Sequence, residues 1–393
     1  MNLDYLYVCR NLKDDDIINN LEYLNAETAA KIIAKAEILG LSGDLRREYL
    51  IYTLTHEANL VSTIIEKSGG SIGESLREAF VHDISILMDI FKNDVDYFQI
   101  IKDYKPTKVS NSESKIYLHQ QLENVDSAET IADIFINYYS RYGYGDIADY
   151  RAFRWNDKLV GIKHFENIHL SDLIGYEHQK EQLTANTSAF VDGKPANNVL
   201  LVGARGTGKS SSVKALANEY FDRGLRLIQI TKPQLKNLPE IMETLRNYAS
   251  KKFIIFLDDL SFEETDPEYK YLKSAIEGGV EARPDNVLIY ATSNRRHLIR
   301  ETWRDRVDGQ DELYRDDSVN ETISLSDRFG LIIYYYAPSQ AEYLQIIRHM
   351  LGKKGIELDD EQLRIEGLRW EMNHSGRNGR TAQQFVTHYL GQH

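Results

Sequence analysis

One short stretch constrains this chain more than any other. Residues 203–210 read Gly-Ala-Arg-Gly-Thr-Gly-Lys-Ser and match the pattern G-x-x-x-x-G-K-[ST] at every fixed position. An apolar run at 198–202 precedes the stretch as a buried strand would, and a run with helical spacing follows it. Glycines let such a loop turn tightly and point its main-chain N–H groups at phosphate oxygens. The stretch therefore predicts a binding site for a nucleoside triphosphate.

The positions of this loop have different expected tasks. Lys209 is expected to reach the β- and γ-phosphates, and the Ser210 hydroxyl is expected to coordinate Mg²⁺. The alternative is a glycine turn that joins strand to helix and binds no ligand; the intact motif in its strand–loop–helix context disfavours it. The expected nucleotide-binding residues of the loop are Gly203, Ala204, Arg205, Gly206, Thr207, Gly208, Lys209, Ser210 and Ser211.

Length and charge limit the other possibilities. A chain of 393 residues with 42% hydrophobic content is expected to form two or three domains. Residues 1–160 contain 26 acidic and 17 basic side chains, a net charge of −9, and the whole chain carries −13. An acidic first domain repels phosphate backbones, which argues against nucleic acid and membrane surfaces as its partners.

Three absences in the sequence predict a cytoplasmic protein. The single cysteine, Cys9, has no partner for an internal disulfide, which fits a reducing compartment. The first residues lack a basic stretch followed by an apolar core, so no signal peptide is evident. No run approaches the roughly 18 apolar residues that a membrane-spanning helix needs.

The pattern divides the chain into three regions. Residues 1–155 predict a mostly helical domain for partner binding or oligomerisation, with helices over 26–39 and along an apolar stripe at 76–91. A glycine cluster at 69–73 lacks a lysine and a preceding strand, so it predicts a turn and not a second phosphate site. Alternating strands and helices over 160–337 predict an α/β domain with a five-stranded parallel sheet, its strands near 198–202, 225–230, 253–258, 287–292 and 331–336. Residues 338–393 predict a lid of three helices.

A pair of acids follows the third predicted strand. The apolar run 253–257 ends in Asp258 and Asp259. A carboxylate at the carboxyl end of a buried strand faces the crevice where ligands bind in such sheets. We therefore expect Asp258 to hold Mg²⁺ and Asp259 to lie near the attacking water. The alternative is a pair of acids that merely opens the next loop.

Residues 165–390 resemble an AAA+ ATPase, with a phosphate loop, a carboxylate motif and a helical lid. Four strings resemble, more closely, one bacterial family of predicted AAA+-type ATPases that carries a domain of unknown function: PANNVLL at 195–201, LDDLSFEE at 257–264, EARPDN at 281–286 and ATSNRRHL at 291–298. The resemblance implies the fold, ATP as nucleotide and Mg²⁺ as its metal. It names no substrate.

The resemblance also implies roles for single residues. Asn294 matches sensor 1, which orients the water, or else it caps the next helix. Arg328 matches the arginine finger that reaches into a neighbouring subunit of a homo-oligomer, or else it is a surface arginine. Arg380 resembles sensor 2 of the lid, and Arg377 is its rival. Ile174 and Gly175 match the segment that packs on adenine.

Two departures from the AAA+ pattern bear on function. Asp259 stands where most AAA+ proteins have glutamate. It is therefore expected to hold the attacking water poorly, and the protein is expected to hydrolyse ATP slowly unless Glu263 or Glu264 substitutes. The loop at 231–236 has no aromatic residue, which argues against a peptide-threading unfoldase. The sequence predicts an ATPase that couples nucleotide state to remodelling or assembly of an unknown protein client. An ATP-gated adaptor with little turnover and a nucleic-acid loader remain the alternatives.

Overall fold

The chain forms two compact units. The structure is a computed structural model that describes residues 2–22, 24–91, 99–110, 112–263, 266–277, 283–294, 298–300 and 325–392. Unit 1 comprises Met1–Tyr150 together with Asp222–Gly224 and Arg246–Lys251. Unit 2 comprises Arg151–Phe221, Leu225–Leu245 and Lys252–His393.

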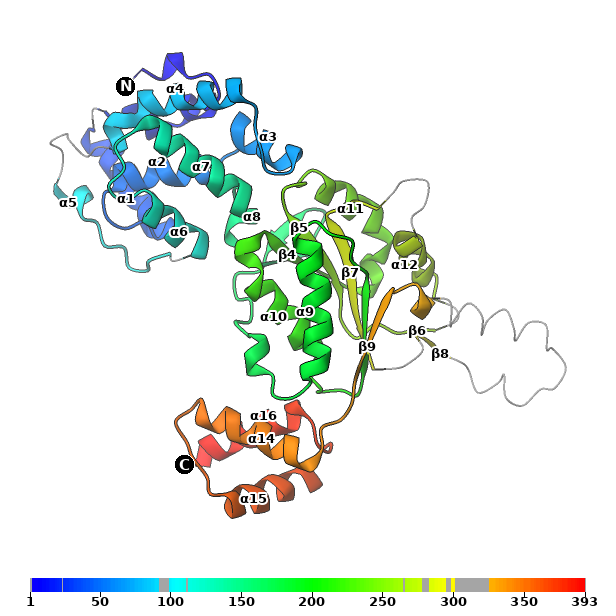
Figure 1. Cartoon of the computed structure of the whole chain (residues 1–393). Coiled ribbons are helices and arrows are strands. Elements are labelled where there is room, and N and C mark those ends of the chain that lie inside the picture. The colour runs from blue at the N-terminus through cyan, green and yellow to red at the C-terminus, as the bar shows by residue number, and fades with distance from the viewer. Residues whose placement is uncertain are drawn as a thin grey trace. The chain divides into compact units, whose positions relative to one another are not determined.

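Unit 1 is helical, as the sequence predicts (Figure 1). Helices α4 and α7 pack together around buried aromatic side chains that include Phe80, Phe135 and Tyr139. Gly69 ends α3 with a φ of 79°, so the glycine cluster contains a helix-ending turn. The α-helices are α1 (Ala26–Leu39), α2 (Leu45–His56), α3 (Leu60–Ser68), α4 (Glu74–Phe91), α5 (Gln99–Lys102), α6 (Glu113–Gln121), α7 (Ala128–Tyr142) and α8 (Asp146–Asp149), and the 3₁₀ turns are η1 (Leu3–Tyr5), η2 (Arg10–Asp14) and η3 (Ile18–Asn20).

A buried ion pair ties the later segment of unit 1 to its helices. Lys251 is fully buried, and its Nζ lies 3.6 Å from Oε1 of Glu66 on α3. The same Nζ donates hydrogen bonds to the carbonyl oxygens of Tyr139 at 3.0 Å and Ser140 at 2.8 Å. Paired and hydrogen-bonded in this way, the charge of Lys251 can be buried. The sequence assigned residues 246–251 to the α/β domain, whereas the structure places them in unit 1.

Unit 2 is built on a mostly parallel sheet in the order β2-β1-β4-β5-β7-β3-β9. Only the β1–β2 pair is antiparallel among the described strands. The chain leaves β3 for β4 on one side and later places β9 on the other side of β3. Ligands bind at such a switch point, beyond the carboxyl ends of the strands. The strands are β1 (Ala152–Trp155), β2 (Leu159–Gly161), β3 (Val199–Gly203), β4 (Leu225–Ile230), β5 (Lys252–Leu257), β7 (Val287–Ser293) and β9 (Leu331–Tyr335), with β6 (Phe262–Glu263) and β8 (Ile299–Arg300) as a separate pair.

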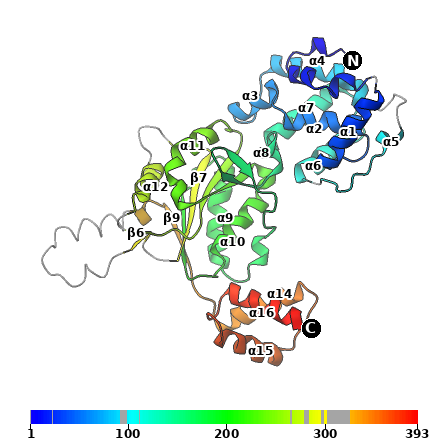
Figure 2. The ribbon, with the colours of Figure 1, turned by 180° about the vertical axis from the view of Figure 1, so that it is seen from behind.

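Helices cover both faces of this sheet (Figures 1 and 2). Helices α9 (Glu177–Val191) and α10 (Lys209–Glu219) lie side by side on one face, where Leu183 and Leu216 enter a core with Leu201 and Tyr290. Helices α11 (Leu238–Arg246) and α12 (Glu268–Glu277) lie on the other face. Two short 3₁₀ turns, η4 (Leu170–Asp172) and η6 (Lys232–Asn237), also belong to this unit, whereas η5 (Phe221–Arg223) begins at its last residue before the chain enters unit 1.

The last helices of unit 2 form a small cluster with its own core. They are α14 (Gln340–Gly352), α15 (Asp360–Met372) and α16 (Gly379–Gln392), close to the three lid helices predicted from the sequence. Ser339 and Asp359 cap the first two helices through their side-chain oxygens. Tyr343, Ile347, Leu363 and Phe385 are buried between the helices. We call residues 338–392 the lid.

The five strands expected from the sequence are present, but the described residues form seven strands in this sheet. Strands β1 and β2 were missed because they have only four and three residues, too few to give a periodic signal. Residues 151–155, which we had assigned to the first domain, therefore belong to unit 2. None of the described helices is long and apolar enough to cross a bilayer.

Candidate functional site

The loop between β3 and α10 has the shape that phosphate binding requires. A Cβ at Gly203 would lie 1.9 Å from the carbonyl oxygen of Tyr335 on β9, so only glycine lets β3 and β9 approach this closely. Gly206 and Gly208 have φ values of 75° and 90°, which favour glycine. Gly208 is the N-cap of α10, so the loop ends where the helix presents its unpaired N–H groups and the positive end of its dipole.

Lys209 lies at the first position of α10 and is almost fully buried. Its Nζ donates hydrogen bonds to the carbonyl oxygens of Gly203 at 2.8 Å and Ala204 at 2.7 Å, and to Oδ1 of Asn294 at 3.1 Å. Burial lowers the pKa of Lys209, and the nearby carboxylates of Asp259 and Asp258 counter part of that shift. The ammonium group is thus held inside the loop by oxygen atoms of the main chain and of one amide.

Asp258 lies where β5 ends, beside the start of α10. Its Oδ1 accepts hydrogen bonds from the Ser210 hydroxyl at 2.5 Å and from the Thr292 hydroxyl at 2.7 Å. A carboxylate and a hydroxyl side by side are oxygen ligands of the kind that Mg²⁺ takes, with phosphate oxygens and water completing its shell. No cluster of three or more histidine, cysteine or acidic side chains suited to a metal occurs within the described part of the chain. The Ser210–Asp258 pair fits a magnesium that is shared with a bound phosphate.

Asp259 has an unusual backbone. Its φ is 53°, in the left-handed region that residues with a side chain rarely adopt. Its Oδ1 accepts a hydrogen bond from the side-chain amide of Asn294, and its Oδ2 lies 3.5 Å from Nη2 of Arg205. The Asp259 side chain is 56% exposed, so the carboxylate is open to solvent as well as to these two partners.

A cavity of about 870 Å³ joins these groups. Its size falls in the range of small-molecule sites. Ile174 lies on its wall, whereas Gly175, Gly203 and Ala204 are absent from the described lining. Residues of the lid, including Ile346, Met350 and Arg380, close one side of it. From the sequence-predicted set, the cavity brings together Ile174, Arg205, Gly206, Thr207, Gly208, Lys209, Ser210, Ser211, Asp258, Asp259, Asn294 and Arg380.

The two candidate arginines of the lid differ in their surroundings. Arg380, at the start of α16, lines the cavity. The Nε of Arg377 lies 3.0 Å from Oε1 of Glu371 on α15, and Arg377 is not part of the described lining. The geometry therefore favours Arg380 as the lid residue that faces a ligand.

Arg328 is not among the described residues that line the cavity of its own chain. It follows a short helical turn at 325–327 and forms an ion pair with Glu277, the last residue of α12. Glu264, one of two acids that we considered as a substitute for Asp259, lies outside the described residues.

A protein-family comparison matches residues 148–393, more than half of the chain, to a family described as "Protein of unknown function (DUF815)". The chain belongs to this family. The match spans the sheet, the phosphate loop and the lid of unit 2. The α/β sheet after a helical region that the sequence predicts is confirmed, and so is the resemblance to a family that carries a domain of unknown function. No curated protein matched the chain.

Solved structures show distant likeness to this DUF815 chain. The Thermotoga maritima RuvB Holliday junction branch migration motor is 18% identical, with a TM-score of 0.38 over 56% of this chain and 63% of the RuvB chain. The chain thus covers less than two thirds of that motor's length. The FIGL-1 AAA domain in complex with ADP is also 18% identical, with a TM-score of 0.39 over 56% of this chain and 72% of that chain.

The structure of the DUF815 chain adds residues that the sequence analysis missed. Thr292 holds both Asp258 and the main chain of Asp259. Its position as a polar residue at the end of a buried strand was a usable signal. Asn378 caps α16 through a hydrogen bond from the Thr381 N–H and lies against Gly206. His349 and Lys353 of the lid line the cavity and had no sequence signal.

Replacing Gly206 by alanine is expected to loosen the lid and to lower stability by about 2–3 kcal/mol. The new Cβ would lie 2.5 Å from Oδ1 of Asn378, the atom that caps α16. Gly376→Ala is a matched control, because Gly376 has a similar φ of 79° but no atom within 4 Å of the added Cβ. It is expected to cost about 1 kcal/mol, from backbone strain alone. Urea unfolding measures both; equal losses would mean that Asn378 moves aside freely.

Proposed function

We propose that this protein is an AAA+-type ATPase that binds ATP and hydrolyses it with Mg²⁺. One observation carries the proposal. At the carboxyl edge of the sheet, a buried lysine, a glycine loop at a helix N-terminus and a hydroxyl–carboxylate pair meet in one cavity. The loop and Lys209 supply positive charge for a triphosphate, and the Ser210–Asp258 pair supplies oxygen ligands for the metal that accompanies it.

The residues of the cavity divide the work. The loop N–H groups and Lys209 bind the β- and γ-phosphates, and Ser210 and Asp258 hold Mg²⁺, which would neutralise charge on those phosphates. Asp259 and Asn294, joined by a hydrogen bond, orient the attacking water. The oxygen of this water forms a bond to the γ-phosphorus, and the bond between the γ-phosphorus and the β–γ bridging oxygen breaks. The proton of the water passes to Asp259. Arg380 contacts the phosphates from the lid. Ile174 and Gly175 pack against the adenine base.

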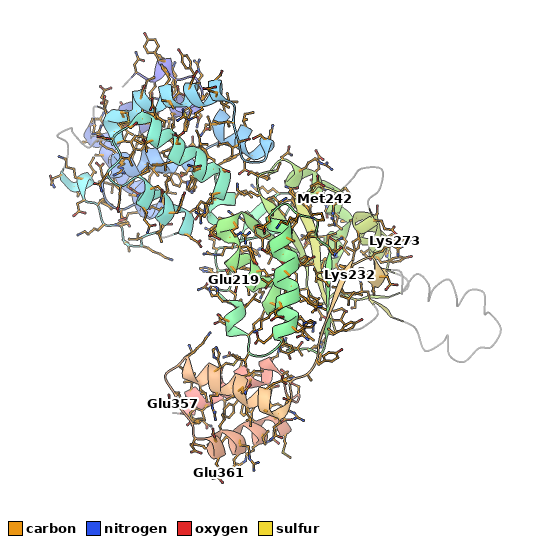
Figure 3. The ribbon with its side chains drawn as sticks, viewed as in Figure 1. Glu219, Lys232, Met242, Lys273, Glu357 and Glu361 are labelled. Carbon is orange, nitrogen blue, oxygen red and sulfur yellow. The ribbon has the colours of Figure 1, made fainter. Side chains whose placement is uncertain are left out.

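Arg328 is the basis for proposing a homo-oligomer. It lies outside the described lining of its own cavity, as expected of a residue that completes the site of a neighbouring subunit. We propose that nucleotide state, read by Arg380 and the lid, changes contacts with a protein client in the cytoplasm. Residues 232–237 form η6, and the loop contains no aromatic residue that could grip a threaded peptide (Figure 3 labels Lys232 in this loop).

An ATP-gated adaptor with little turnover is the second candidate. It is favoured by Asp259, a short acid whose carboxylate already has Asn294 and Arg205 as partners. A general base bound in this way has less free capacity to accept a proton from water. A nucleic-acid loader is a third candidate with less support, because the chain carries a net charge of −13; salt-dependent retention on DNA would favour it.

Asp259→Asn is expected to leave ATP binding intact and to lower the rate of phosphate release by about 10²-fold, because the amide cannot accept the water's proton. Steady-state phosphate release by the assembled protein measures this, and a fluorescent ATP analogue measures binding. Asp285→Asn, an acid that the described cavity lining does not include, serves as the control. If the wild-type assembly binds ATP but releases no phosphate above background, the adaptor replaces the ATPase.

A further inference from the structure

The hydroxyl of Thr292 joins the two acids at the end of β5. Thr292 is buried on β7 with 1% of its surface exposed. Its Oγ1 donates a hydrogen bond to Oδ1 of Asp258 at 2.7 Å and accepts one from the main-chain N–H of Asp259 at 2.9 Å. We propose that Thr292 is a positioning residue that fixes the metal-holding and the water-facing carboxylates relative to each other. This inference rests on the proposed function, which assigns Thr292 no role.

The main chain needs this hydroxyl because the β-ladder stops just before it. The last β5–β7 pair is Leu257 with Ala291, so the N–H of Asp259 lies beyond the ladder. Asp259 then turns into the left-handed region, where a residue with a side chain must be held by its neighbours. Thr292 holds this turn twice: its hydroxyl accepts from Asp259, and its carbonyl oxygen accepts from the N–H of Leu260 at 2.7 Å.

The same hydroxyl orients Asp258. Both hydroxyl donors, Ser210 and Thr292, point at Oδ1, which leaves Oδ2 for other partners. In the proposed function, Ser210 turns its oxygen towards Mg²⁺ when a nucleotide binds. Thr292 then remains as the side chain that keeps the Asp258 carboxylate in place, and residues that orient metal ligands in this way tune metal affinity.

Threonine suits this position better than valine or serine, the residue types closest to it in size. Its β-branched side chain has few rotamers and fits a strand, so the hydroxyl is held in one direction. Valine keeps the shape and lacks the hydroxyl, whereas serine keeps the hydroxyl and lacks the methyl group. Thr292→Val and Thr292→Ser therefore form a matched pair that separates hydrogen bonding from packing.

The first test uses the full-length protein without nucleotide or metal. Thr292→Val is expected to raise the hydrogen-exchange rate of the Asp259 amide at least about tenfold, because the amide loses its acceptor. Thr292→Ser is expected to exchange at a rate close to that of wild type. If Thr292→Val exchanges as slowly as wild type, the hydroxyl does not hold the turn and the inference is wrong.

The second test titrates Mn²⁺ into the protein with bound ADP and follows it by electron paramagnetic resonance. Thr292→Val is expected to weaken Mn²⁺ binding about 10–100-fold, with ADP affinity in EDTA unchanged and Thr292→Ser close to wild type. Equal losses in both variants would assign Thr292 to packing and overturn the inference. If Thr292→Val does not fold, Thr292→Ala undergoes the same tests. A wild type that binds no nucleotide would instead refute the proposed function, while the exchange test still decides the role of Thr292.

Discussion

Replacing Arg328 by alanine is expected to lower ATP turnover about 10³–10⁵-fold and to leave ATP binding close to the wild-type level. The expected loss is this large because a guanidinium group that reaches the γ-phosphate from a neighbouring subunit stabilises charge that develops only in the transition state. Phosphate release and fluorescent-nucleotide binding, measured on the assembled protein, provide the two values. A fall in binding that matches the fall in turnover would contradict this role.

Two controls show how Arg328 acts. Glu277→Gln removes the ion pair seen in the structure and leaves the guanidinium in place, so it is expected to retain turnover if Arg328 serves a neighbour. Mixing Arg328→Ala subunits with Lys209→Ala subunits is expected to restore part of the activity, because the second kind supplies Arg328 to the first. No recovery in mixed assemblies would mean that the arginine acts within its own chain or only structurally.

Replacing Lys209 by alanine is expected to weaken ATP binding by about 10³-fold, because the phosphates lose charge-assisted hydrogen bonds that contribute about 1.5–3 kcal/mol each. The lysine is buried, so little water is present to take over its role. Isothermal titration with ATP measures the change.

Lys214 provides a matched control for Lys209. It lies on the same helix and lines the same cavity, but its Nζ pairs with Glu166 at 3.0 Å. Lys214→Ala is expected to change ATP affinity by about threefold or less, as a partly exposed ion pair contributes little. Should both variants bind ATP like wild type, the triphosphate does not sit on the 203–210 loop.

Much of unit 2 follows from local patterns in the sequence. The buried strand β5 was predicted from its apolar run alone, since burial of the strand leaves a strong signal in the sequence. Lys209, Ser210 and Asp258 could be predicted as site residues because phosphate and metal chemistry admits few residue types at those places. Arg380 and Arg377, by contrast, are equivalent in sequence and differ only in what their side chains meet.

Other features depend on contacts between distant residues. Nothing local indicates that the Thr292 hydroxyl lies within 2.7 Å of Asp258, because this follows from the β5–β7 pairing. The left-handed backbone of Asp259 is equally hidden, since aspartate seldom adopts it without support. Strands β1 and β2 are too short for a periodic signal and gain stability only through their neighbours in the sheet.

Unit 1 is built from three separate segments of the chain, so a single cut cannot divide the protein into its two complete units. The backbone passes from one unit to the other after Tyr150, Phe221, Gly224, Leu245 and Lys251. A fragment that starts at Arg151 would carry Lys251 without Glu66 and without the carbonyl groups of α7 that bind its ammonium. The segments that lead into β4 and β5 would then lose their support, and β5 ends at the acids of the proposed site. An isolated form of the helical unit must therefore include the two short segments Asp222–Gly224 and Arg246–Lys251.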